Sequence, residues 1–250
     1  MNIKGNTILI TGGATGIGFA LAEALVKTGN TVIICGRREK RLNEAKEKIP
    51  ALYTRKCDVT QETDRETLFD WISTEFKSLN MLVNNAGIQK MIDFTTGAEG
   101  LFTRDDEINT NLTAPIDMAA LFAPFLMRQK AAAIINVSSG LGFVPIAAMP
   151  VYCATKAALH SFSISLRYQL RNTTVKVFEI IPPAVETELG RSEGDEEPGY
   201  PGMKPAVLAQ EVLESLAKDN YEIPVGEAKG LVEGSCRDFQ KAFDDMNHWG

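Results

Sequence analysis

Residues 11–18 read Thr-Gly-Gly-Ala-Thr-Gly-Ile-Gly, and this stretch decides the fold. A short apolar run over residues 7–10 precedes it, and a helical pattern of apolar residues that ends at Gly29 follows it. Glycines between a strand and a helix allow a tight turn and let a pyrophosphate approach the free N–H groups of the helix. The stretch therefore predicts a dinucleotide-binding site, and a glycine-rich turn without a ligand is the alternative. The residues expected to contact the dinucleotide here are Gly12, Ala14, Thr15, Gly16, Ile17 and Gly18.

Strands and helices alternate along the rest of the chain. The apolar, β-branched segments that predict strands are residues 31–35, 52–56, 81–83, 133–137 and 175–181. Amphipathic patterns predict helices over residues 38–49, 61–76, 105–130 and 152–170. The third helix contains Pro115 and Pro124, which can kink or break it. This alternation predicts an α/β fold, a single Rossmann-type, doubly wound parallel sheet with helices on both faces.

The domain organisation follows from this pattern. We expect residues 1–250 to form a single dinucleotide-binding and catalytic domain. After Ala206 the sequence leaves room for one helix, a short strand at residues 222–223 and a tail.

Composition and charge argue against several classes of protein. The chain has 250 residues, a net charge of −6 and an isoelectric point near 5.1, so it lacks the basic footprint of a nucleic-acid-binding protein. It has no apolar run long enough to span a membrane, and its first residues do not resemble a signal peptide. The four cysteines and two histidines show no metal-binding spacing, so we expect a reduced, cytoplasmic protein without a metal.

The end of the second predicted strand indicates which dinucleotide binds. Dehydrogenases that use NAD place a carboxylate there, which binds the adenosine ribose. In this chain Gly36 is followed by Arg37 and Arg38, and the first acid is Glu39. Guanidinium groups suit a 2′-phosphate, so NADP(H) is favoured over NAD(H). The alternative is that both arginines simply begin an exposed helix.

Two further segments follow predicted strands and are expected to contact the cofactor. The first is Asp58-Val59, where the carboxylate either hydrogen-bonds an adenine amino group or caps the helix that begins near Gln61. The second is Asn85-Ala86-Gly87, where an amide and small residues can hold a loop against the cofactor. Asn and Gly also favour an ordinary turn, so this segment is not specific by itself.

Tyr152 and Lys156 are four residues apart and would share one face of a helix. A phenol has an unperturbed pKa of about 10, and an adjacent cation lowers it, so the pair predicts a tuned general acid. A solvated helix face is the alternative for this spacing alone. Ser139 closes the strand-rich segment upstream and would face the same crevice, with Ser138 as its competitor. We expect His160 to be a surface or packed side chain rather than a catalytic acid or base.

Together these motifs resemble the short-chain dehydrogenase/reductase family, in the single-domain branch whose members are about as long as this chain. The resemblance covers residues 7–187 and includes Asn111. It implies that Tyr152 is the acid/base that protonates a carbonyl as hydride arrives from a nicotinamide. It also implies that Ser139 orients the carbonyl and stabilises the oxyanion, that Lys156 binds the nicotinamide ribose and lowers the phenol pKa, and that Asn111 holds a water for proton relay.

The resemblance also places Pro182 and Thr187 at the cofactor, with one departure. The family usually has Pro-Gly ahead of this threonine, and this chain has Pro182-Pro183. Proline lacks the φ freedom and the N–H of glycine, so the approach of the loop to the nicotinamide is expected to differ. Residues 187–205 are rich in Gly, Glu and Pro and predict a mobile substrate loop, or else an exposed insertion.

We therefore expect an NADP(H)-dependent oxidoreductase that interconverts a carbonyl and an alcohol on a small, largely apolar molecule. The alternatives are a non-catalytic dinucleotide-binding sensor or scaffold, and an epimerase or dehydratase of the family's longer branch, against which the length and the glycine spacing argue. By the same resemblance we expect a homodimer or homotetramer. The sequences of residues 84–90 and 151–160 are also similar to a bacterial subgroup labelled DltE-like.

Overall fold

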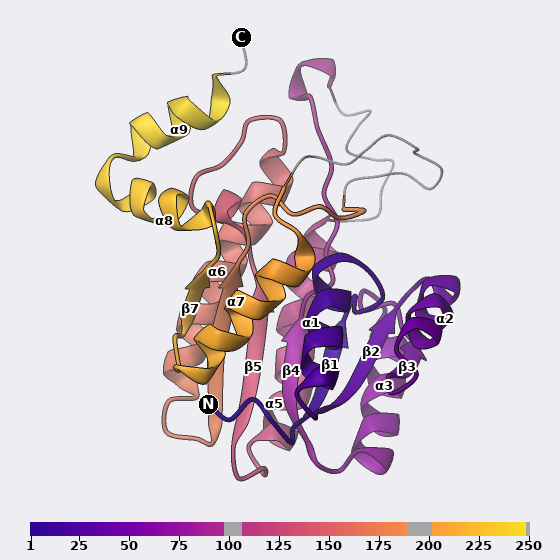
Figure 1. Cartoon of the computed structure of the whole chain (residues 1–250). Helices are drawn as coiled ribbons and strands as arrows, with labels where there is room; N and C mark the ends of the chain where they lie inside the picture. The colour runs from indigo at the N-terminus through magenta and orange to yellow at the C-terminus, as the bar shows by residue number, and fades with distance from the viewer. Residues whose placement is uncertain (98–106, 190–201, 249–250) are drawn as a thin grey trace.

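The computed structural model describes residues 1–97, 107–189 and 202–248. In this part of the chain, seven parallel strands form one sheet in the order β3-β2-β1-β4-β5-β6-β7 (Figure 1). The strands are β1 Thr7–Thr11, β2 Thr31–Gly36, β3 Tyr53–Lys56, β4 Leu79–Asn84, β5 Ala132–Val137, β6 Val175–Ile181 and β7 Glu222–Pro224. The order reverses between β1 and β4, and open α/β sheets bind their ligands at such a reversal, outside the carboxyl ends of the strands. The predicted doubly wound sheet is confirmed.

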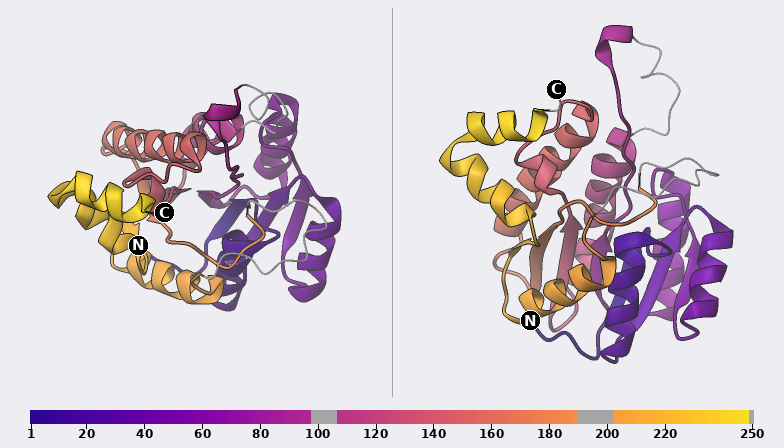
Figure 2. Two further views of the ribbon diagram at one scale, coloured as in Figure 1. Left: turned by 90° about the horizontal axis from the view of Figure 1, so that it is seen from above. Right: turned by 45° about the horizontal axis from the view of Figure 1, so that its top comes forward.

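Helices cover both faces of the sheet (Figure 2). One apolar core joins the sheet to α1 Gly16–Lys27, α2 Glu39–Lys48 and α7 Pro205–Ala217. A second core joins the other face to α3 Glu62–Glu75, α5 Ala114–Leu126 and α6 Pro150–Gln169. The remaining elements are η1 Phe94–Thr96, η2 Asn109–Thr113, η3 Gly140–Gly142, α8 Ala228–Arg237 and α9 Phe239–Asn247.

The strands are apolar along most of their length because helices cover both faces of the sheet. Side chains alternate between the two faces of a strand, so Ile8 and Ile10 lie in one core while Leu9 lies in the other. On β5, Ile135 and Ile134 divide in the same way. Both faces of a parallel sheet are covered by helices, and neither face therefore needs polar residues along most of its length.

The helix predicted over residues 105–130 is shorter and less regular than expected. α5 ends at Leu126, and turn-type hydrogen bonds from Arg128 and Gln129 to carbonyls three residues back close it. At the other end the chain forms a π-helix, η2, directly before α5, whose second residue is Pro115. Proline cannot donate the regular helical hydrogen bond to the carbonyl of Asn111, and a π-turn accommodates this loss. Residues 98–106 lie outside the described residues.

The prediction of a tail after the short strand was wrong. α8 and α9 follow β7 and pack over the loop that succeeds β5 (Figure 1). A β-carbon at Gly140 would lie 2.8 Å from Leu231 Cδ1 of α8. Asn247 of α9 accepts a hydrogen bond from the Ala147 N–H at 2.6 Å and donates one to the Pro145 carbonyl at 3.0 Å. None of the described helices has both the length and the apolar character that crossing a membrane requires.

Candidate active site

The glycine loop between β1 and α1 has a backbone that requires glycine at two positions. Gly12 has φ of 62°, and a β-carbon there would lie 2.9 Å from the Ala86 Cα. Gly16 has φ of 56°, and a β-carbon there would lie 3.0 Å from Thr187 Cγ2. Other residues would be strained at these positive φ values and would fill the space beside the start of α1. This cradle at a helix N-terminus fits the pyrophosphate of a dinucleotide.

Thr11 fastens the loop after β4 to the glycine loop. Its hydroxyl oxygen accepts hydrogen bonds from the N–H groups of Asn85 and Ala86, each at 3.0 Å. In return, Asn85 Nδ2 donates to the carbonyls of Thr11 at 2.9 Å and Gly12 at 3.1 Å. β1 and β4 are neighbours in the sheet, so the Asn85-Ala86-Gly87 segment lies against the glycine loop rather than forming an isolated turn. We did not predict a role for Thr11, although it begins the decisive stretch.

The arginines after β2 converge on a carboxylate. Arg38 Nη1 lies 3.2 Å from Glu188 Oε2, and Arg41 Nη2 lies 2.7 Å from Glu188 Oε1. Arg38 Nη2 also donates to Thr15 Oγ1 of the glycine loop at 3.4 Å. Arg37, directly before the N-cap of α2, is exposed. The structure thus shows an anion held by two guanidinium groups next to the pyrophosphate cradle. Arg41 was missed in the sequence, where its place three residues after Arg38, the N-cap of α2, was the available signal.

Asp58 does not cap α3, so that alternative was wrong. The N-cap is Gln61, and no side chain caps the helix. The Asp58 side chain instead accepts two hydrogen bonds from Thr60, one from its N–H at 3.0 Å and one from its hydroxyl at 2.8 Å. Val59 is buried, and its carbonyl accepts a hydrogen bond from Arg65 at 2.8 Å. A contact of Asp58 and Val59 with adenine stays a prediction.

The π-helix η2 holds Asn111, which is fully buried. Its Oδ1 accepts a hydrogen bond from the Ile88 N–H at 2.8 Å, and its Nδ2 donates to the Ile88 carbonyl at 2.8 Å and to Thr155 Oγ1 at 3.2 Å. The two protons of the amide are therefore used to join η2, the loop after β4 and α6. The predicted water would need the remaining lone pair of Oδ1 or the main-chain carbonyl, which lacks its regular donor because residue 115 is proline.

Tyr152 and Lys156 share one face of α6 and are both buried. Lys156 Nζ donates to the Val137 carbonyl at 2.9 Å and lies 5.6 Å from the centroid of the Tyr152 ring. A β-carbon at Gly87 would lie 3.3 Å from Asn111 Oδ1 and 3.7 Å from Lys156 Nζ, so the loop after β4 approaches both side chains.

The pKa values of this pair differ from the expectation of a lowered phenol pKa. Burial raises the pKa of Tyr152 to about 12, and the hydrogen bond with Ser139 opposes it. Burial lowers the pKa of Lys156 to about 8, and the charge of Glu179 opposes that shift. The ammonium group is directed at a backbone carbonyl and is itself desolvated, so its charge does not outweigh the burial of the phenol.

Ser139, rather than Ser138, contacts the phenol. The Ser139 hydroxyl interacts with Tyr152, and its oxygen also accepts a hydrogen bond from the Leu141 N–H at 3.1 Å. Ser138 is buried, and its hydroxyl instead donates to the Ile180 carbonyl at 3.3 Å. The four residues predicted for catalysis therefore gather at the carboxyl ends of β4 and β5, although their roles stay predictions.

On the segment after β6, Pro182 lies next to this cluster and Thr187 lies next to the glycine loop. The Pro182 carbonyl accepts a hydrogen bond from the Gly140 N–H at 3.0 Å, directly after Ser139. Thr187 lies against Gly16, and its hydroxyl accepts a hydrogen bond from the Leu189 N–H at 3.2 Å. The two prolines thus leave Thr187 beside the glycine loop. Residues 190–201 of the predicted substrate loop lie outside the described residues.

Two other acidic or basic side chains belong to this region. Glu107, one turn before Asn111, is buried and raises the pKa of Tyr152. It was missed because that helical segment carried no motif. His160 is packed, with its ring centroid 4.4 Å from that of Phe143.

Among the described residues no cluster of three His, Cys, Asp or Glu side chains is arranged to hold a metal ion.

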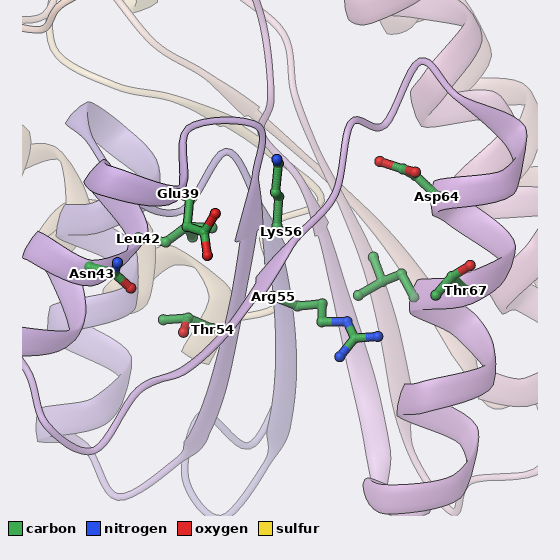
Figure 3. A pocket seen from close by; sticks show the side chains of 9 residues that line it. Glu39, Leu42, Asn43, Thr54, Arg55, Lys56, Asp64 and Thr67 are labelled. Atoms are coloured by element: carbon green, nitrogen blue, oxygen red, sulfur yellow. The ribbon is translucent and has the colours of Figure 1, made fainter.

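A hollow of about 380 Å³ lies elsewhere, at the β3 edge of the sheet (Figure 3). Side chains of α2, β3 and α3 line it, including Glu39, Arg55, Lys56 and Asp64. None of the predicted site residues lines this hollow, so it is separate from the candidate active site.

Comparison with known proteins agrees with this geometry. The sequence profile of a family described as short chain dehydrogenase matches residues 6–198. The chain belongs to the short-chain dehydrogenase family. It is 49% identical over 248 residues to an uncharacterized oxidoreductase, DltE, of Bacillus subtilis, covering 99% of this chain and 98% of that protein.

Two further proteins to which the chain is similar carry more specific descriptions. A serine 3-dehydrogenase of Agrobacterium fabrum is 34% identical over 218 residues, covering 84% of this chain and 86% of that protein. A short chain dehydrogenase from Burkholderia cenocepacia, solved in complex with NADP, matches with a TM-score of 0.80 and 26% identity, covering 98% of this chain and 99% of that one. The family assignment makes the chain an oxidoreductase.

Proposed function

We propose that this protein is an NADP(H)-dependent oxidoreductase that interconverts a carbonyl and an alcohol, with Tyr152 as the general acid/base. The observation that carries the proposal is the buried cluster of Ser139, Tyr152, Lys156 and Asn111 beside the glycine cradle. The cradle and the cluster lie at the same carboxyl edge of the sheet, where open α/β sheets bind ligands. When bound, the nicotinamide supplies or accepts the hydride.

The protein groups perform the proton chemistry. A substrate carbonyl between Ser139 and Tyr152 would accept hydrogen bonds from both hydroxyls, which stabilises the charge that develops on its oxygen. With a pKa of about 12, the Tyr152 phenol is fully protonated at neutral pH and is ready to donate. An alkoxide is a stronger base than a phenolate, so the transfer from Tyr152 is favourable. The Lys156 ammonium then stabilises the phenolate until it is reprotonated.

The arginine pair supports NADP(H) over NAD(H). Arg38 and Arg41 hold both oxygens of the Glu188 carboxylate, and a 2′-phosphate presents the same type of acceptor. The solved relative bound to NADP supports the same choice. NAD(H) lacks this phosphate and would leave the two guanidinium groups without that partner.

The surroundings of Tyr152 support a small and largely apolar substrate. Tyr152 packs with Met149 and Cys153, and Leu141, Ile146 and Ala148 lie against them. The serine 3-dehydrogenase relative supports a CH–OH group as the hydride donor.

On α6, Ile164 and Tyr168 are 44% and 67% exposed, which supports association of two or four copies of the chain.

The test is NADPH oxidation over a panel of ketones and aldehydes, with the wild type compared with Tyr152→Phe. We expect turnover of at least one apolar carbonyl by the wild type and its loss in the variant, with NADPH binding retained in both. Tight NADPH binding without turnover of any carbonyl would favour the dinucleotide-binding sensor. Equal turnover by Tyr152→Phe would refute the role of the phenol.

A further inference from the structure

A buried carboxylate lies behind the acid/base pair. Glu179 of β6 is fully buried in the interior of the sheet, next to residues of the apolar core. Its Oε2 lies 2.8 Å from His160 Nδ1. Its Oε1 is also buried and has no hydrogen-bond donor among the described residues. A buried, incompletely paired carboxylate is unfavourable for stability, so its presence needs a reason other than packing.

Glu179 belongs to a row of polar residues that crosses four adjacent strands, and Glu222 of β7 is its register partner on the outer side. Asn84 pairs with Asn136, and Asn136 pairs with Glu179, in the parallel register of β4, β5 and β6. Asn84 Nδ2 donates to Asn136 Oδ1 at 2.9 Å, and Asn136 Nδ2 donates to Ser163 Oγ of α6 at 2.9 Å. The row therefore lies between the sheet and the helix that carries Tyr152 and Lys156, at the point where the apolar core gives way to the site.

The same face of α6 carries three ionisable residues in succession. Tyr152, Lys156 and His160 are each four residues apart, so they are stacked along one side of the helix. Lys156 Nζ is held by the Val137 carbonyl, one residue after Asn136 on β5. Glu179 contacts His160 directly, and its charge also acts on Lys156, where it raises the pKa against the effect of burial.

The remaining charged groups around Glu179 and His160 come from β7 and α6. In the described part of the chain, the groups that shift the pKa of His160 are Glu179, Glu222 of β7 and Arg167 of α6. The hydrogen bond with Glu179 is the strongest influence and raises this pKa. On the η3 side the neighbour of His160 is Phe143, which is not ionisable.

We propose that Glu179 and His160 are positioning residues for the acid/base pair: Glu179 holds Lys156 in its ammonium form, and His160 fixes the carboxylate and partly offsets its charge. The inference rests on the proposed function, because it assigns Lys156 a part in that reaction. Only the charged form of Lys156 stabilises the phenolate, so the carboxylate behind it sets the upper pH limit of the site.

The activity test compares the pH profile of kcat for the wild type and Glu179→Gln. This substitution keeps the shape of the side chain and removes its charge. We expect the alkaline limb to move to lower pH by about 1 unit, since removing an opposite charge shifts a pKa by that order. Glu23→Gln is the control for net charge, because Glu23 forms an exposed ion pair with Lys27 on α1, is not among the groups that shift the pKa of Lys156 or His160, and should leave the limb in place. A uniform loss of kcat in Glu179→Gln with no movement of the limb would show a purely structural role and would overturn the proposal.

Two measurements keep the inference separate from the proposed function. The pH dependence of NADPH affinity reports the charge of Lys156 without turnover, and we expect the same downward shift in Glu179→Gln. The chain has two histidines, so NMR titration resolves His160 with His248 as an internal reference. We expect a raised His160 pKa in the wild type that falls in Glu179→Gln. A His160 pKa unchanged by Glu179→Gln, or an NADPH-affinity limb that does not move, would overturn the proposal even if carbonyl reduction is observed.

Discussion

The contact between Glu188 and the two arginines makes a specific prediction about cofactor affinity. Glu188 occupies Arg38 and Arg41 through two ion pairs of 3.2 and 2.7 Å, and its side chain is 37% exposed. A 2′-phosphate that uses the same guanidinium groups must displace this carboxylate. Removing its charge with Glu188→Gln removes the internal competitor, so NADPH should bind more tightly. NADH has no phosphate at this position, and its affinity should not change.

The magnitude follows from the exposure of the ion pairs. Exposed pairs contribute roughly 0.2–1 kcal/mol each, so the two together amount to about 1 kcal/mol. This free energy corresponds to roughly a fivefold decrease in the Kd of NADPH. The gain should shrink at high salt, which screens exposed charges.

Fluorescence titration of NADPH and NADH at low and high salt measures this effect. Glu23→Gln is a matched control, because Glu23 is also in an exposed ion pair, with Lys27, and its loss makes the same change in net charge. A Kd for NADPH that is unchanged or higher in Glu188→Gln would refute the competition. Equal tightening of NADPH and NADH would show that the effect is not directed at the phosphate.

Three other substitutions test the cofactor site and the fold. Arg41→Ser should weaken NADPH by about tenfold and NADH little, because a charge-assisted hydrogen bond contributes about 1.5 kcal/mol; titration of both cofactors measures it. Thr11→Val should lower the free energy of unfolding by about 1–3 kcal/mol, because two N–H groups lose their acceptor, and urea denaturation measures it. His160→Gln should destabilise the protein most below about pH 6.5, the unfolded pKa, because a raised folded pKa stabilises the protonated state. The difference in stability should disappear as the pH rises through the folded pKa, and denaturation at several pH values would reveal a constant difference if this reasoning is wrong.

The fold could be predicted because its local signals agree with its global arrangement. The glycine loop and the β-branched runs such as residues 31–35 mark the parallel sheet without reference to tertiary contacts. The C-terminal helices could not be predicted in the same way. Few side chains of α8 and α9 are buried: Ala228 is the buried residue of α8, and α9 has none. These helices are held in place by contacts with residues far away in the sequence, such as the hydrogen bonds of Asn247 with Pro145 and Ala147.

The residues of the candidate site also fall into two groups, those that the sequence predicts and those that it does not. Tyr152, Lys156, Ser139 and Asn111 follow from spacing and from the family resemblance. The partners that complete the site are separated widely along the chain: Arg38 and Glu188 are 150 residues apart. Such pairs have no local pattern, because only the folded sheet brings the segment after β6 to the start of α2. Sequence reasoning therefore identified the groups to which we assign the chemistry but not the groups that hold them.

The pKa of Tyr152 shows why the environment matters as much as the residue. A phenol beside a lysine on one helix face suggested an acid activated by its neighbour, yet burial dominates and raises the pKa to about 12. Lys156 is buried as well, and it keeps its charge against desolvation with the help of Glu179. The cation that stabilises the phenolate therefore depends on an anion in the next layer. An alkaline limit set by Glu179 follows from this arrangement, since loss of the Lys156 proton would leave a buried phenolate without a counter-charge.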